Sequence, residues 1–229
     1  MSGNSGNNGQ VTGKDNRELS KAELRRKENF GKIEEELISK GYRRVDLTIS
    51  IAKANTVGIL ITLPIIAVVA VAFILYNHGL NMESILNAPW PDYMNIVIFL
   101  VSFIAFVFIH EGIHGLCWSF GTPGHFKDIE FGFIVQLLTP YCTCKVPLSI
   151  PVYIFGSLMP MTLLGIIPGI ICIFFGNPFF LGIFAIQILA GAGDFLITCL
   201  VIRHMSKTKS KDVVLIDHPY ECGAVIFEK

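Results

Sequence analysis

The chain has 229 residues, no formal net charge, an apolar content of 52% and a mean hydropathy of +0.57. This composition excludes an ordinary soluble domain and a basic nucleic-acid-binding protein, and it indicates an integral membrane protein in contact with the lipid bilayer. We expect no nucleic-acid partner, and the sequence leaves the oligomeric state open.

The N-terminal part of the chain is polar. Residues 1–19 are mainly Gly, Asn and Ser, a composition typical of a disordered tail. Residues 20–54 predict a cytoplasmic amphipathic helix from an N-cap at Ser20 to about Lys40, with a stop at Gly41 and a short strand after it. The first apolar segment begins beyond residue 50, so no cleavable signal peptide is predicted.

Four apolar segments predict a membrane domain over residues 55–203. They cover residues 57–76, about 95–117, about 150–175 and about 179–202, and each can cross a hydrocarbon core of about 30 Å. The third is interrupted by prolines and glycines such as Pro160 and Gly165, which weaken a helix unless neighbours satisfy its backbone. The predicted fold is an all-α integral membrane protein with four transmembrane helices, an N-terminal cytoplasmic helix and a small cytoplasmic β-hairpin.

The distribution of basic residues predicts the orientation. Eleven Lys and Arg residues precede the first span, two lie in the loop 121–148 and five follow the last span, whereas the loops 77–93 and 176–178 have none. The positive-inside rule therefore predicts a multi-pass protein of the cell membrane, with both termini and the loop 121–148 in the cytoplasm. Residues 204–229 then form a cytoplasmic tail with a turn and a short apolar strand.

The second span carries the sequence His110-Glu111-Gly112-Ile113-His114 near its C-terminal end. Two histidines four residues apart lie on one face of a helix, so both imidazoles can bind one metal ion. An ionisable side chain at bilayer depth costs about 2.5–3.5 kcal/mol on insertion scales and is a functional candidate by default. The alternative interpretation is a polar cluster satisfied by neighbouring helices.

A catalytic zinc site needs a third protein ligand and an open position for water. Asp194 is favoured because it lies about 15 residues into its span, as His110 does, which places both about 22 Å deep at 1.5 Å per residue. The small residues Gly191-Ala192-Gly193 would let another helix approach closely. Asp194 could instead bind backbone groups freed by the prolines of the third span. Other candidate ligands are His125 and the pair Cys142 and Cys144, and Cys117 is expected to pack near the site without binding the metal.

Alternating apolar residues in the loop 121–148 predict a β-hairpin with Pro140 at or near its turn. Because the loop starts a few residues after His114, the hairpin should cover the cytoplasmic mouth of the site. Its exposed edge could hold an unfolded substrate segment as an added strand. Alternatively, the hairpin could lie in the membrane interface as an anchor.

The motif His110-Glu111-x-x-His114, followed by Asp194 after Gly191-Ala192-Gly193, resembles the putative zincin peptidase family of small bacterial membrane proteins. The sequence Pro-Tyr-Cys-Thr-Cys-Lys over residues 140–145 and the sequence Asp-His-Pro over residues 217–219 also fit this family. The resemblance runs from about residue 40 to the end and implies a four-span protein with a metallopeptidase site.

A more distant resemblance is to the site-2 protease superfamily of intramembrane zinc proteases, which also uses two motif histidines and an aspartate from a later helix. This chain lacks that superfamily's Asn-Pro-Asp-Gly-type sequence around Asp194. It also has Trp118 where a small residue is expected.

The sequence therefore predicts a membrane-embedded zinc metalloendopeptidase that hydrolyses peptide bonds of membrane or membrane-associated proteins near the cytoplasmic side. His110, His114 and Asp194 would bind the metal, and Glu111 would take a proton from the zinc-bound water. Two other functions stay open: a non-catalytic membrane adaptor with a structural metal, and a divalent-metal transporter. The predicted turn at 217–219 could contribute second partners for the metal-binding histidines.

Overall fold

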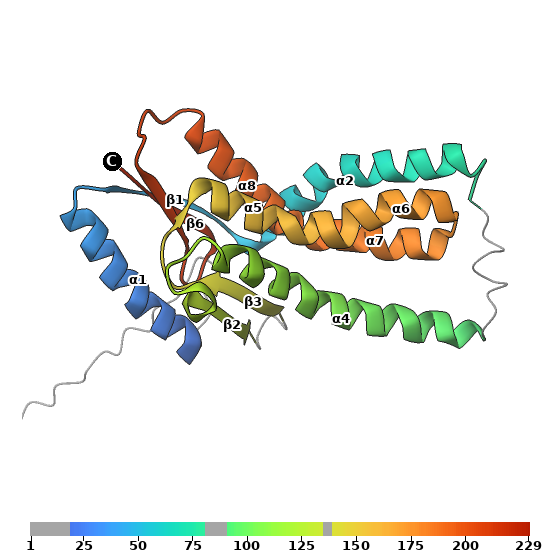
Figure 1. Cartoon of the computed structure of the whole chain (residues 1–229), viewed down its shortest axis with the longest axis horizontal. Coiled ribbons are helices and arrows are strands. Elements are labelled where there is room, and N and C mark those ends of the chain that lie inside the picture. Colours follow the sequence, from blue (N-terminus) through green and yellow to red (C-terminus); the bar gives the residue numbers. More distant parts are fainter. Residues whose placement is uncertain (1–18, 81–90, 135–138) are drawn as a thin grey trace, which may run out of the picture.

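The computed structural model describes residues 19–80, 91–134 and 139–229. Long apolar helices form a bundle, and two small sheets with an additional helix lie at one end of it (Figure 1). The helices are α1 (Lys21–Ser39), α2 (Ile51–Tyr76), α4 (Asp92–Ser119), η1 (His125–Asp128), α5 (Ile150–Met161), η3 (Thr162–Ile166), α6 (Ile167–Phe175), α7 (Pro178–Ala190) and α8 (Ala192–Met205). The strands are β1 (Arg43–Ile49), β2 (Ile129–Ile134), β3 (Thr139–Cys144), β4 (Leu148–Ser149), β5 (Val213–Asp217) and β6 (Cys222–Glu228).

The N-terminal helix α1 begins and ends close to the predicted positions. Ser20 Oγ accepts a hydrogen bond from the Glu23 N–H, and the Glu23 carboxylate accepts one from the Ser20 N–H, which forms a capping box. Gly41 follows the helix with φ +86°, a left-handed conformation that glycine adopts without a Cβ clash. The predicted disordered tail lies almost wholly outside the described residues.

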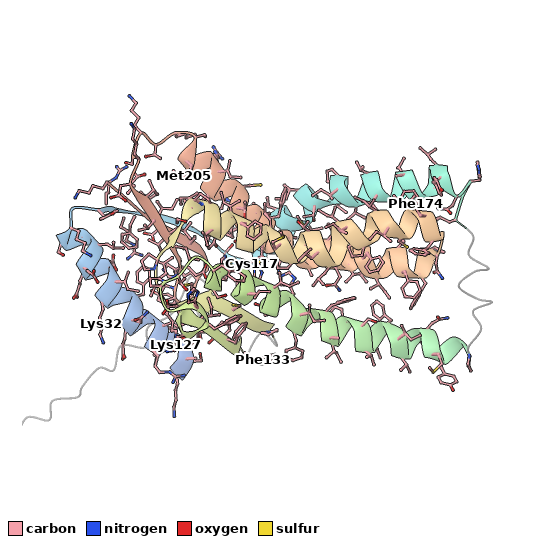
Figure 2. The ribbon with its side chains drawn as sticks, in the orientation of Figure 1. Lys32, Cys117, Lys127, Phe133, Phe174 and Met205 are labelled. Carbon is pink, nitrogen blue, oxygen red and sulfur yellow. The ribbon has the colours of Figure 1, made fainter. Side chains whose placement is uncertain are left out.

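Within the described part of the chain, three helices are long and apolar enough to cross a membrane: Ile51–Tyr76, Tyr93–Ser119 and Ile150–Phe175. Large apolar side chains are exposed along them, as contact with lipid requires (Figure 2). A fourth span is present if α7 and α8, bent by 43° relative to each other, count as one. The described residues therefore contain three candidate spans, or four if α7 and α8 are counted as one span.

Two spans differ from the prediction in their continuity. The third span runs from Ile150 to Phe175. At the expected interruption the helix continues and changes locally from α-helical to π-helical hydrogen bonding in the turn η3. The fourth predicted segment, about 179–202, consists of two helices, α7 and α8, that meet at Gly191. Glycine weakens a helix, and a Cβ at this position would lie 2.7 Å from the Met161 Cβ, so the bend also allows close packing on α5.

A four-stranded antiparallel sheet in the order β1-β6-β5-β4 joins the two ends of the described chain. Strand β1 pairs with β6 from Arg43 opposite Glu228 to Ile49 opposite Cys222. The fold prediction included a strand before the first span and another in the C-terminal tail, but it did not pair them. The expectation of a hairpin as the small β-structure was therefore incomplete.

The two faces of this sheet pack against different parts of the molecule. On one face, Val225 and Phe227 of β6 pack with Ile216 and with Phe30 of α1. On the other face, Leu215, Ala224 and Ile226 join a buried cluster with residues of the membrane helices and the hairpin, including Trp118, Cys142, Tyr153 and Val201. The sheet thus connects α1 to the end of α4 that carries the histidine motif.

The predicted hairpin is formed by β2 and β3, which pair from Ile129 opposite Cys144 to Ile134 opposite Thr139. Pro140, which was predicted at or near the turn, lies in β3 opposite Phe133. Residues 135–138, between the two strands, are outside the described part of the chain. A Cβ on Gly115 would lie 2.4 Å from Phe131 Cζ, so this glycine lets the hairpin lie against α4 directly after the histidine motif.

Candidate metal centre

Two histidines and one aspartate from different helices meet at the centre of the predicted site. His110 and His114 lie on α4, and Asp194 lies in the first turn of α8. His110 Nε2 is 3.2 Å and His114 Nε2 is 3.4 Å from the same oxygen, Asp194 Oδ2. One donor atom from each residue lies within 4.8 Å of the other two. The structure therefore brings together the three side chains that the sequence nominated as ligands.

The spacing of these donor atoms fits zinc coordination. Zinc binds imidazole nitrogen and carboxylate oxygen at about 2.0–2.2 Å with tetrahedral angles, which places neighbouring donors about 3.3 Å apart. The two separations from Asp194 Oδ2, 3.2 and 3.4 Å, match this value. Two imidazoles and one carboxylate are also a common zinc ligand set that leaves a fourth position open. The residues present fit the metal that was predicted.

His114 is held in the tautomer that a metal ligand needs. Its Nδ1 lies 2.9 Å from the carbonyl oxygen of Gly156, and since a carbonyl only accepts, Nδ1 carries the proton and donates. Nε2 then has a free lone pair directed toward Asp194. Pro160 lies four residues after Gly156 and has no N–H, so it cannot make the usual helical bond to this carbonyl. The proline in α5 thereby leaves the carbonyl free for the histidine.

An aromatic stack continues from His114 toward the sheet. The rings of His114 and Trp118 stack with centroids 5.0 Å apart, and those of Trp118 and Tyr153 stack at 5.7 Å. Trp118 Nε1 also donates to the Tyr153 carbonyl oxygen at 3.3 Å. A Cβ on Gly156 would lie 2.2 Å from Trp118 Nε1. A residue without a side chain is therefore required where α5 passes this stack.

The site has a closed side and an open side. The side chains of His110 and His114 are 9% and 4% exposed, whereas that of Asp194 is 35% exposed. Within the described part of the chain, the buried His110 Nδ1 has no hydrogen-bond partner, so its ring is fixed less firmly than that of His114. The exposed side of the centre is therefore the side of Asp194.

Glu111 lies next to strand β3. The backbone amide of Cys142 lies near the Glu111 carboxyl group. Cys142 opposes Phe131 of β2, so an amide that points toward Glu111 lies on the edge of β3 that β2 does not occupy. Among the described residues no strand pairs with this edge, so the hairpin brings an unpaired strand edge beside the motif glutamate.

The other candidate ligands lie outside this group. His125 Nδ1 contacts the Ser119 carbonyl oxygen at 3.1 Å. Cys142 and Cys144 are buried free cysteines in β3. Burial raises the pKa of the Cys144 thiol to about 11 and that of Cys142 further, which keeps both protonated. Cys117 is also a free cysteine and belongs to no candidate metal-binding group of the described residues.

The turn predicted at residues 217–219 lies near the same buried cluster. Asp217 accepts a hydrogen bond from Thr143 Oγ1 at 2.9 Å. Burial raises the pKa of Asp217, while hydrogen bonds from Thr143 and Tyr153 oppose the rise. His218 Nδ1 accepts from the Glu221 N–H at 3.0 Å, which fixes the turn before β6. The hydrogen bond between Thr143 and Asp217 thus stabilises the contact between β3 and β5.

Sequence reasoning missed the groups that orient His114. Pro160 was noted only as a residue that weakens a helix, and Trp118 only as a departure from a related pattern. The available signal was the spacing: a proline four residues after a glycine in a membrane helix frees a carbonyl at a position where another helix can approach.

Residues 103–209, which include the histidine motif and Asp194, match the model of a protein family described as "Putative zincin peptidase". The matching family is the one that the sequence resembles. Its description indicates a metallopeptidase of the zinc-dependent class. No curated protein and no solved structure matches the chain. The resemblance to site-2 proteases therefore stays a prediction.

Proposed function

We propose that this protein is a membrane-embedded zinc metalloprotease that hydrolyses peptide bonds of membrane or membrane-associated proteins. The observation that carries the proposal is the convergence of His110, His114 and Asp194 at separations that suit one zinc ion. The match to the peptidase family over this segment supports it. Glu111, between the two histidines, is the proposed catalytic residue.

Each group of the site would have a separate role in the reaction. A zinc ion bound by these ligands supplies Lewis-acid chemistry, because it lowers the pKa of a bound water toward about 7 and polarises a carbonyl. Glu111 accepts the proton of the attacking water and later donates it to the leaving amine. Gly156 keeps the His114 ring oriented, and the partly exposed side of Asp194 admits water and substrate.

We further propose four spans with both termini on the cytoplasmic side. The basic residues concentrated before the first span and after the last favour this orientation. The pairing of β1 with β6 supports it, since it places the start and the end of the described chain at the same end of the helix bundle (Figure 1). An even number of spans is required for this arrangement, so α7 and α8 would together form the fourth.

The free edge of β3 is the proposed docking strand for substrate. An extended segment could pair with this edge through main-chain hydrogen bonds and lie beside Glu111. This arrangement would present an unfolded part of the substrate to the metal centre. The competing role, an anchor in the interface, requires no such pairing.

The decisive comparison is between the wild type and Glu111→Gln, purified in detergent and supplied with a peptide library. We expect equal zinc content in both, and cleavage, quantified as new peptide N-termini by mass spectrometry, that is about 10²–10⁴-fold slower in the variant. Glu28→Gln, an exposed substitution on α1, removes one carboxylate and serves as the control with unchanged cleavage.

Each alternative function predicts a different outcome. Similar cleavage by the wild type and Glu111→Gln would contradict the role of the glutamate. Zinc binding without cleavage of any peptide by the wild type would favour the adaptor with a structural metal. Zinc uptake by proteoliposomes that contain the protein would favour the transporter.

A further inference from the structure

A second concave site lies between α1 and the outer face of the β2–β3 hairpin, away from the three metal-binding side chains. Its volume is about 530 Å³, within the range of small-ligand sites. One wall is formed by α1, including Arg25, Arg26 and Asn29, and the other by the hairpin and Lys145. The Asn29 side chain donates to the Lys145 carbonyl oxygen at 2.9 Å, which joins the two walls.

Three cations line this cavity without an acidic partner. Among the residues that the structure describes, Arg25, Arg26 and Lys145 make no ion pair within 4 Å. The Arg26 guanidinium lies 4.1 Å above the centre of the Tyr141 ring, which holds it in place by a cation–π contact. Its Nε is buried and has no hydrogen-bond partner in the described chain. A buried donor without a partner is uncommon and indicates a missing acceptor.

The carboxylates of the cavity do not fill this role. Glu130 accepts a hydrogen bond from the Tyr141 hydroxyl at 3.4 Å, and Asp217 accepts from Thr143. Three cations against two carboxylates leave the lining with a net positive charge. Among the described residues, the unsatisfied buried polar atom of this lining is Arg26 Nε, a donor. Together with the net positive charge, it favours an anion as the ligand.

The position of the cavity favours an anion at the membrane surface. The hairpin lies against the last turns of the membrane helix α4, where Phe131 packs on Gly115. Phe131 and Phe133 of β2 also line the cavity and are 52% and 49% exposed. Basic groups beside exposed aromatic rings suit a phosphate headgroup whose acyl chains continue along apolar surface.

We infer that this cavity binds a phosphate group, with Arg26 as its main ligand and Arg25 and Lys145 beside it, and that an anionic phospholipid is the source. Arginine binds phosphate through paired N–H groups, which a lysine cannot reproduce. The occupied site would connect α1 to the hairpin and to the lipid around α4. This inference does not depend on catalysis.

The full-length protein in neutral detergent provides the test, with short-chain phosphatidylglycerol as the probe and native mass spectrometry or fluorescence as the readout. Arg26→Gln should weaken binding by about tenfold or more, and Arg26→Lys should restore it only in part. Lys32→Gln is the matched control, since it removes one charge from an exposed position of α1 outside the cavity lining. It should change binding less than about twofold.

A second arm separates the two sources of phosphate. Inorganic phosphate is titrated against the bound lipid. If phosphate displaces the lipid only at a much higher concentration than that of the lipid, the lipid is supported as the source. If phosphate binds as tightly as the lipid, the lipid is overturned as the source. Equal lipid binding by the wild type, Arg26→Gln and Arg25→Gln overturns the whole inference. Using the Glu111→Gln background for all measurements keeps the result independent of the proposed protease activity.

Discussion

His114 Nδ1 donates to the carbonyl oxygen of Gly156 across the contact between α4 and α5, at 2.9 Å. This single bond sets which nitrogen of His114 faces Asp194, and it depends on two features of α5 that weaken a helix. Gly156 provides the space for Trp118, and Pro160 removes the competing N–H. Outer partners of this kind change metal affinity by about 10–100-fold when they are lost.

Gly156→Ala should weaken zinc binding by about 10–100-fold. The added methyl group would lie 2.2 Å from Trp118 Nε1, and the indole is held by stacking on both sides, so the stack and His114 must shift. Competition with a chromogenic zinc chelator measures the affinity. Gly193→Ala is the control, because no atom lies within 4 Å of a Cβ at this position beside Asp194. Equal losses in both variants would contradict the role of Gly156.

Pro160→Ala should also weaken zinc binding, by about tenfold, the low end of the range for outer partners. The new N–H would compete with His114 for the Gly156 carbonyl and draw it back along the helix axis. The loss should be smaller than in Gly156→Ala, since a carbonyl oxygen can accept two hydrogen bonds. Pro168→Ala, in the same span, should leave the affinity unchanged.

Cys142→Ser and Cys144→Ser should both retain zinc at wild-type stoichiometry. The two thiols lie in the buried cluster with Trp118 and Tyr153 and are outside the group of three donors. Metal analysis of the purified variants gives the answer. Loss of zinc from either variant, with normal unfolding behaviour, would indicate that a cysteine replaces one of the three assigned ligands.

Glu228 should make the protein sensitive to acid. Its carboxylate accepts hydrogen bonds from Arg43, from His204 at 2.9 Å and from Thr208 at 2.8 Å. The Arg43 bond is the main cause that lowers the pKa of Glu228 to about 2. Because this value lies below the ordinary pKa of 4.5, the stabilisation is complete above about pH 4.5 and is lost as the pH falls toward 2.

Unfolding followed by tryptophan fluorescence in detergent measures this effect. The free energy of unfolding of the wild type should decline between about pH 4.5 and 2, and Glu228→Gln should show a smaller decline over the same interval. Identical pH dependence in both proteins would show that the contact between α8, β1 and β6 does not rely on this ionised carboxylate.

Features with local signals could be predicted from the sequence. The capping box of Ser20 and Glu23 involves neighbouring residues, and the apolar spans depend on composition. Asp194 was found because an isolated carboxylate in an apolar helix requires partners. The residues that determine the helix start and the spans lie within one or two helical turns of one another. Asp194 was detectable because a carboxylate without a partner is unfavourable in an apolar environment.

Features that depend on contacts between distant residues could not be predicted. The pairing of Arg43 with Glu228 joins opposite ends of the sequence, and short alternating strands carry no information on their partners. The break at Gly191 depends on packing against Met161, and the freed carbonyl of Gly156 becomes useful only because His114 lies opposite. The break and the freed carbonyl both depend on how two helices pack against each other, which the sequence does not specify.

The most direct test of the account is the zinc content and affinity of Asp194→Asn compared with the wild type. We expect one zinc per wild-type chain and an affinity reduced more than about 100-fold in Asp194→Asn, beyond the loss expected for an outer partner. Asp217→Asn, which changes a partly buried carboxylate outside the group, should retain the metal. Wild-type zinc affinity in Asp194→Asn would contradict the assignment of His110, His114 and Asp194 as one metal centre.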